Sequence, residues 1–121
     1  MEIRSRDNAE PFTTADGSTI RVLLDREAGG ARNGSLAEAE LGPDQATERH
    51  YHAETEEIYV LLEGSAEMEV DGERRAVGPG DAVLIPPGAW HQITAGGDGG
   101  VRFLCACAPP YRHEDTFFVE T

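Results

Sequence analysis

The chain contains no lysine: all ten of its basic side chains are arginines, against 23 acidic side chains among 121 residues. The formal net charge is therefore −13 at pH 7. Nucleic acids and anionic membrane surfaces bind proteins through clustered positive charge. This composition argues against nucleic acid and against a membrane as partners.

Long hydrophobic runs are also missing. No stretch approaches the roughly 20 apolar residues of a membrane helix. The first ten residues, MEIRSRDNAE, lack the apolar segment of a secretory signal. Only two cysteines occur, Cys105 and Cys107, and residues this close in sequence seldom form a disulfide. We therefore expect a cytoplasmic protein with reduced thiols.

Helical periodicity is absent as well. Short apolar or alternating runs recur between turn signals such as Asp71-Gly72, whose residue types favour a tight hairpin turn. This rhythm predicts an all-β single domain, built as an antiparallel barrel or a double-sheet sandwich. We expect residues 1–18 to form an N-terminal arm or edge strand and residues 19–121 to form the domain. The expected strands cover residues 19–24, 35–41, 47–52, 57–62, 66–70, 74–77, 82–85, 90–94 and 101–107.

Three of the expected strands are apolar on both faces, with the sequences IYVLL, AVLI and VRFLCAC. One face of such a strand fills the interior, and the other needs cover from a second layer or a partner subunit. The sequence therefore predicts a homodimer.

The stretch HYHAETEE, residues 50–57, carries the strongest chemical signal. Alternation along a strand puts His50 and His52 on one face, about 6.6 Å apart. Glu57 opens the next expected strand, and His91 follows the rigid turn PPG. A lone histidine pair is usually a surface feature, but three imidazoles and a carboxylate together suit one divalent ion of iron, manganese, nickel, cobalt, copper or zinc.

Two longer patterns contain these residues. Residues 50–64 are similar to the first motif of the cupin family, and residues 80–95 to the second; the matching patterns are His50-x-His52-x4-Glu57-x6-Gly64 and Gly80-x5-Pro86-x-Gly88-x2-His91. The resemblance is to small single-domain bacterial cupins. It implies a jelly-roll barrel in which His50, His52, Glu57 and His91 bind the metal. Two positions depart from the family pattern, Asp44 in place of a glycine and Ala95 in place of an asparagine.

The choice of glutamate depends on register. The family spacing fits both Glu56 and Glu57, but only Glu57 leaves six residues between itself and Gly64 and shares a strand face with Tyr59. We therefore expect Glu57 as the ligand. Glu54 and Glu56 are expected at the solvent-exposed rim.

Strand alternation predicts the other inward side chains. Glu48 and Tyr59 are the polar candidates for contact with a substrate, and we expect Glu57 and Tyr59 as catalytic residues. The remaining inward residues are expected to be core packing: Met68, Val83, Ile85, Ile93, Phe103, Cys105 and Cys107. Trp90 should pack outside the cavity. His113 is expected on the surface or in a dimer contact.

The resemblance implies a metal-dependent enzyme that acts on a small organic molecule. A site with three histidines and one glutamate leaves coordination positions open for a substrate or for O₂. We expect a dioxygenase or other oxygenase first. The alternatives are a metal-dependent isomerase or cyclase of the polyketide or sugar type, and a cupin that binds a small molecule without turning it over.

Overall fold

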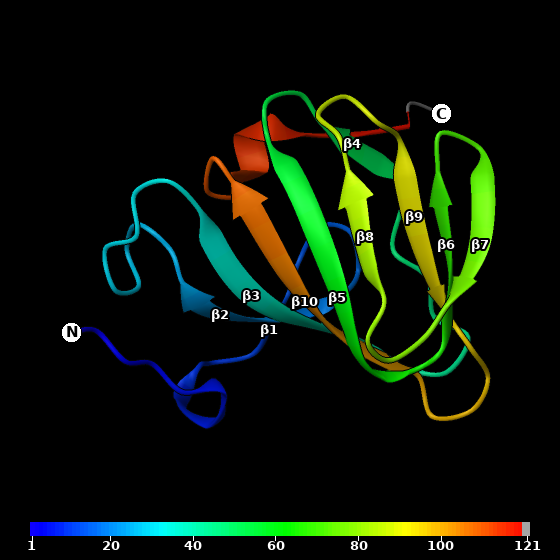
Figure 1. Ribbon diagram of the computed structural model, residues 1–121, viewed down its shortest axis with the longest axis horizontal. Coiled ribbons are helices and arrows are strands. Elements are labelled where there is room, and N and C mark those ends of the chain that lie inside the picture. Colours follow the sequence, from blue (N-terminus) through cyan, green and yellow to red (C-terminus); the bar gives the residue numbers. More distant parts are fainter. Residues whose placement is uncertain (120–121) are drawn as a thin grey trace.

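Two antiparallel sheets face each other in the computed structural model, which describes residues 1–119 (Figure 1). One sheet has the strand order β1-β2-β3-β10-β5-β8 and the other β11-β4-β9-β6-β7. The first sheet comprises β1 (Phe12–Thr13), β2 (Thr19–Leu24), β3 (Ser35–Leu41), β10 (Val101–Ala108), β5 (Glu56–Gly64) and β8 (Ala82–Ile85). The second comprises β11 (Thr116–Phe118), β4 (His50–His52), β9 (His91–Ala95), β6 (Ala66–Val70) and β7 (Glu73–Val77). Two 3₁₀ turns, η1 (Arg6–Asn8) and η2 (His113–Asp115), complete the described elements.

All nine expected strands are present, which confirms the all-β jelly-roll prediction. Two further strands are present: β1 lies within the N-terminal segment for which an arm or edge strand was expected, and β11 lies where no strand was expected. The largest boundary error concerns β4, which begins at His50 and not at residue 47. The backbone N–H of Glu48 donates to the carbonyl of Asp16 (2.8 Å). Residue 48 therefore bonds to a loop and is not part of strand β4. The prediction that Glu48 points inward beside the histidines is therefore wrong, because its side chain is exposed.

The core lies between the two sheets and follows the period of two. Along β9, inward residues are buried and the residues between them are half-buried. The predicted inward residues Met68, Ile85, Ile93 and Phe103 are each at most 3% exposed. Burying one such side chain contributes about 1.5–3 kcal/mol. This packing fixes the strand register on which the site depends.

Several residues between the strands have positive backbone φ angles. Asp71 (φ 48°) and Gly72 (φ 89°) form the predicted primed turn between β6 and β7. Asp44 also has a positive φ, 61°, so it takes the left-handed conformation at a position where the cupin motif usually has glycine. Gly64 cannot be replaced freely, since a Cβ there would clash with the carbonyl oxygen of Gly100.

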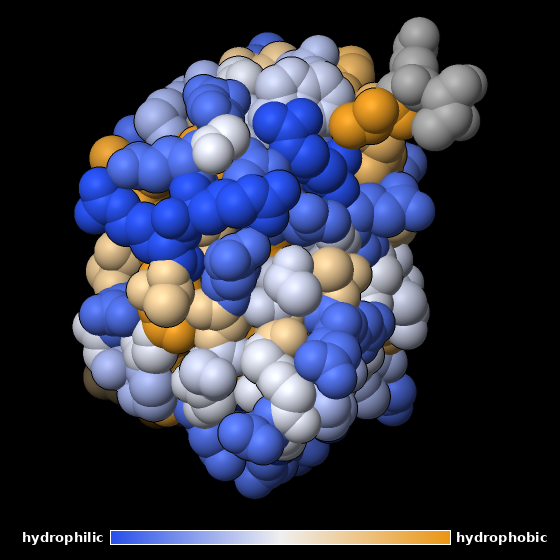
Figure 2. Space-filling model, turned by 90° about the vertical axis from the view of Figure 1, so that its right-hand side faces the viewer, coloured by the Kyte–Doolittle hydropathy of each residue, from blue (hydrophilic) through white to orange (hydrophobic). Residues whose placement is uncertain are grey.

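The outer surface is uneven in polarity. Figure 2 shows that the face formed by the β6–β7 hairpin is largely hydrophilic, and the exposed ion pairs Arg74–Glu67 and Arg75–Glu73 lie on this hairpin. The outer face of β5 and β8 differs, because Ile58, Leu62 and Leu84 are 39%, 36% and 56% exposed. In the described part of the chain, no helix is long and apolar enough to span a membrane.

Candidate metal centre

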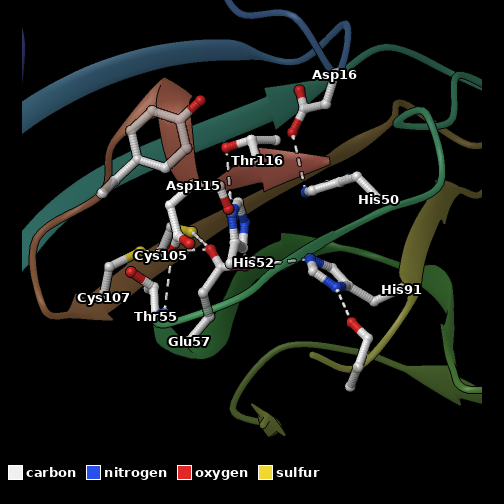
Figure 3. Close-up of polar contacts among 12 residues, drawn as sticks. Asp16, His50, His52, Thr55, Glu57, His91, Cys105, Cys107, Asp115 and Thr116 are labelled. Carbon is white, nitrogen blue, oxygen red and sulfur yellow. Dashed lines mark hydrogen bonds and ion pairs between the residues drawn. The ribbon is translucent and has the colours of Figure 1, made fainter. Parts of the chain in front are cut away.

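Four buried side chains from three strands meet at one end of the barrel. β4 provides His50 and His52, β9 provides His91, and β5 provides Glu57. His50 is the direct cross-strand partner of His91, and each of the four side chains is 1–3% exposed. One donor atom from each residue lies within 4.8 Å of the others. The structure therefore brings together the four residues that the sequence patterns singled out (Figure 3).

The backbone fixes the tautomer of all three imidazoles. Each Nδ1 lies beside a main-chain carbonyl oxygen: Glu48 for His50 (2.7 Å), Asp115 for His52 (3.3 Å) and Ala89 for His91 (2.9 Å). A carbonyl oxygen only accepts, so each Nδ1 must carry the proton and donate it. A neutral ring then has its lone pair on Nε2, directed into the cluster. This arrangement is typical of histidines that bind metal.

The interior of the cluster supports the fit of a cation. Oε1 of Glu57 lies 2.9 Å from Nε2 of His52 and 3.1 Å from Nε2 of His91. Nevertheless, within the described residues, Glu57 Oε1 and His91 Nε2 are buried without a hydrogen bond of acceptable geometry. With the proton of a neutral His91 at Nδ1, its Nε2 and the carboxylate oxygen are both acceptors, so neither satisfies the other. Three nitrogen donors and one carboxylate oxygen around one point fit a first-row divalent ion.

The electrostatic state of the cluster follows from burial and proximity. Burial alone would raise the pKa of Glu57, but the imidazoles of His52 and His91 outweigh it and hold that pKa far below its usual range. Burial lowers the pKa of His50, and its neighbour His91 lowers it further. Burial also opposes protonation of His52, but the Glu57 carboxylate prevails and raises the pKa of His52. The metal-free cluster therefore keeps Glu57 ionised.

Two thiols hold the other oxygen of Glu57. Sγ of Cys105 donates to Oε2 at 3.1 Å and Sγ of Cys107 donates at 3.4 Å. In the β5–β10 register, Cys107 lies opposite Glu57 and Cys105 opposite Tyr59. Alternation predicted that the cysteines point inward, but it gave no sign of this contact. The pair fixes the carboxylate so that Oε1 faces the histidines.

The segment after β10 completes the site from the C-terminal side. β11 pairs with β4 along its whole length, and in Figure 1 this segment is drawn in red beside β4. Asp115 is 4% exposed, and its carboxylate accepts backbone N–H groups of residues 53, 54 and 55 at 3.0–3.2 Å. Its carbonyl holds His52. His113, by contrast, is exposed and takes no part in the cluster.

Asp16 approaches the cluster from the loop between β1 and β2. Three donors converge on its Oδ1: Thr14 Oγ1 (2.6 Å), Ser18 N (2.9 Å) and Ser18 Oγ (2.6 Å). Oδ2 lies 3.9 Å from Nε2 of His50, and Figure 3 shows the carboxylate directed at that ring. The sequence prediction placed residues 1–18 outside the domain and missed Asp16. Its only sequence signal is the Thr-x-Asp-x-Ser pattern of a polar turn.

A cavity opens beside the cluster, and aromatic and aliphatic side chains form much of its wall. Its lining includes Asp16, His50, His52, Glu57 and both cysteines, together with Phe12, Ile20, Val22, Tyr59, Phe103 and Tyr111. The ring of Tyr59 packs on Phe103 (4.8 Å between centroids) and lies 6.1 Å from the ring of His91. Burial raises the pKa of Tyr59 well above its ordinary value, so its hydroxyl stays protonated. The exposed Glu48 does not line the cavity.

Comparison with known proteins agrees with this geometry. The sequence model of the cupin domain matches residues 37–107. The chain therefore belongs to the cupin family. Protein MJ1618 of Methanocaldococcus jannaschii is 41% identical over 114 residues, which cover 94% of this chain and 91% of that one.

Two enzymes are also similar to the chain. The structure of the polyketide cyclase RemF from Streptomyces resistomycificus superposes with a TM-score of 0.79 at 30% identity, covering 95% of this chain and 89% of RemF. Quercetin 2,3-dioxygenase of Bacillus subtilis is 34% identical over 90 residues, which are 68% of this chain but only 27% of that enzyme. The cupin relatives of the chain thus include enzymes.

Proposed function

We propose that His50, His52, Glu57 and His91 bind one divalent transition-metal ion, and that the protein is an enzyme acting on a small organic molecule in the adjoining cavity. The observation that carries the proposal is the buried convergence of Glu57 Oε1 and His91 Nε2, neither of which has a hydrogen bond among the described residues, beside imidazoles whose Nδ1 atoms all face backbone carbonyls. When bound, such an ion supplies Lewis-acid polarisation of a substrate oxygen and open coordination positions.

The reaction class that we favour is a non-redox isomerisation or cyclisation. Similarity to RemF extends over nearly the whole of both chains, which supports this class. Glu57 would act as a metal ligand and not as a mobile base, because both thiols hold its second oxygen. The protonated hydroxyl of Tyr59 would orient a polar group of the substrate by donating a hydrogen bond. The apolar walls would exclude water from the reacting carbon atoms.

An oxygenase is the second candidate. The similarity to quercetin 2,3-dioxygenase favours it, and a site with three histidines and a glutamate suits metals that react with O₂. In this case the cavity residues would hold the organic substrate beside the open coordination positions. The roles of Tyr59 and of the apolar walls would be unchanged.

One experiment tests the proposal and separates the two classes. The protein is purified without chelator, its metal content is measured, and the loaded protein is incubated with small enols, phenols and diketones. Turnover under strict anaerobiosis supports the isomerase or cyclase. Substrate loss coupled to oxygen uptake supports the oxygenase. Less than one ion per four chains after loading contradicts the metal centre, and binding without turnover identifies a non-catalytic cupin.

We also propose a homodimer and a cytoplasmic location. The exposed apolar side chains Ile58, Leu62 and Leu84 on the outer face of β5 and β8 support a second copy as cover. The two cysteines are free thiols, which fits a reducing compartment.

A further inference from the structure

The charged side chains that line the cavity are all acidic or belong to the histidine cluster. Asp16, Asp25 and Glu57 provide three carboxylates. Although the chain has ten arginines, none of those described lines the cavity. Proteins commonly bind phosphate and carboxylate groups through arginine, lysine or the N-terminus of a helix. The wall of this cavity offers none of these.

The charge balance at the site also disfavours an anion. Three carboxylates carry −3, and one divalent ion carries +2, so the loaded site remains at −1. An anionic ligand would add further negative charge beside the buried Glu57 and the partly buried Asp16 and Asp25, where water screens charge less than in bulk solvent. A neutral ligand avoids this repulsion.

Asp16 gives the cavity a fixed hydrogen-bond acceptor. The three donors from Thr14 and Ser18 hold Oδ1, so the direction of the carboxylate is set by the loop. Oδ2 lies at the cavity wall near the ring of His50. An ionised carboxylate only accepts hydrogen bonds, and it binds a hydroxyl donor about twice as strongly as a neutral acceptor does.

We propose that the cavity selects neutral, largely apolar molecules that carry a hydroxyl group, with Asp16 accepting the hydrogen bond from that hydroxyl. Carboxylates and phosphates are disfavoured. The inference rests on the proposed metal-dependent function of the same cavity, and it specifies the substrate class. Residues of the first and second motifs hold the metal, whereas a loop outside both motifs recognises the substrate.

The test uses two probes that differ in one group, 2-naphthol and 2-naphthoate, at pH 7. Binding to the metal-loaded protein is measured by isothermal titration calorimetry. We expect 2-naphthol to bind at least tenfold more tightly. In Asp16→Asn the affinity for 2-naphthol should fall roughly tenfold, since a hydrogen bond to a charged acceptor is lost, while that for 2-naphthoate should rise. Glu48→Gln removes one charge from an exposed neighbour outside the cavity and should change neither affinity.

Ser18→Ala provides a second variant, because it removes one donor to Oδ1 and leaves the carboxylate in place. It should reduce the preference for 2-naphthol by a smaller factor than Asp16→Asn does. Thermal melting of each variant verifies folding. The inference is overturned if 2-naphthoate binds as tightly as 2-naphthol, if Asp16→Asn leaves the ratio unchanged, or if neither probe binds at 1 mM. Metal content is measured in the same samples: an empty centre refutes the proposed function, whereas a loaded centre that prefers 2-naphthoate refutes only the substrate class.

Discussion

Replacing Glu57 with glutamine tests the metal centre most directly. The substitution keeps the size of the side chain but removes the negative charge and one of the two oxygens that the cluster uses. The histidines keep their positions, because their Nδ1 contacts are to backbone carbonyls. Loss of an outer hydrogen-bond partner typically lowers metal affinity 10- to 100-fold. Loss of a charged ligand should exceed this, so we expect at least a 100-fold weaker Kd, equivalent to about 2.8 kcal/mol.

Glu56→Gln is the matched control. Glu56 precedes Glu57 on the same strand and is exposed, so its substitution changes the net charge equally without touching the cluster. The Kd is measured by competition with a chromogenic chelator, and stoichiometry by elemental analysis. His52→Ala and His91→Ala should weaken binding as Glu57→Gln does. The assignment is refuted if Glu56→Gln loses metal while Glu57→Gln retains it, or if all these variants keep full occupancy.

Four further outcomes follow from the contacts around the cluster. Replacing both Cys105 and Cys107 by alanine should lower metal affinity about 10- to 100-fold. Replacing both by serine should retain most of the affinity, because a hydroxyl can also donate to Glu57. If the alanine and serine variants lose affinity equally in chelator competition, a hydrogen-bonding role is refuted. Asp115→Ala leaves three backbone N–H groups without their acceptor. The free energy of unfolding, measured by urea denaturation, should therefore fall by about 3 kcal/mol. A loss below about 1 kcal/mol would contradict this. Because the Glu57 carboxylate raises the pKa of His52, the metal-free protein holds a proton there to higher pH than a free imidazole does, and the ion must displace it; affinity should therefore fall as the pH is lowered. Calorimetry in buffers of different ionisation enthalpy should detect proton release on metal loading, and its absence would count against this state. Leu84→Glu places a charge on the apolar outer strand and should convert a dimer into a monomer in light scattering; a wild-type monomer at micromolar concentration would exclude the dimer.

The strands and the four clustered residues were predictable because local signals determine them. Short apolar or alternating runs between turn signals located the nine expected strands, and the period of two along a strand put His50 and His52 on one face. Only one register places Glu57 inward, and in the structure Glu57 is buried while Glu56 is exposed. These features depend on residues close together in the sequence, or on motifs of fixed spacing.

Several supporting contacts were not predictable, since they join segments that are distant in the sequence. Asp115 contacts His52 across 63 positions, mainly through a carbonyl that every residue type has. Asp16 reaches the cluster from a polar turn, and a turn has no hydrophobic periodicity from which the direction of its side chains could be predicted. Glu48 misled the prediction for a related reason: its N–H bonds to the carbonyl of Asp16 and not to a sheet partner, so alternation does not extend to it.

Because β11 pairs with β4, the metal centre is completed only after the segment that contains β11 has been synthesised. Residues 113–118 leave the ribosome after every other strand of the two sheets. The carbonyl of Asp115 that orients His52 is therefore added after the three strands that carry the four donor residues, so these strands exist before the site can accept an ion with three fixed imidazoles. Cleavage between β10 and β11 followed by loss of the C-terminal fragment would leave the other strands of the two sheets but remove the carbonyl that orients His52. Metal loading thus reports the integrity of the C-terminal segment.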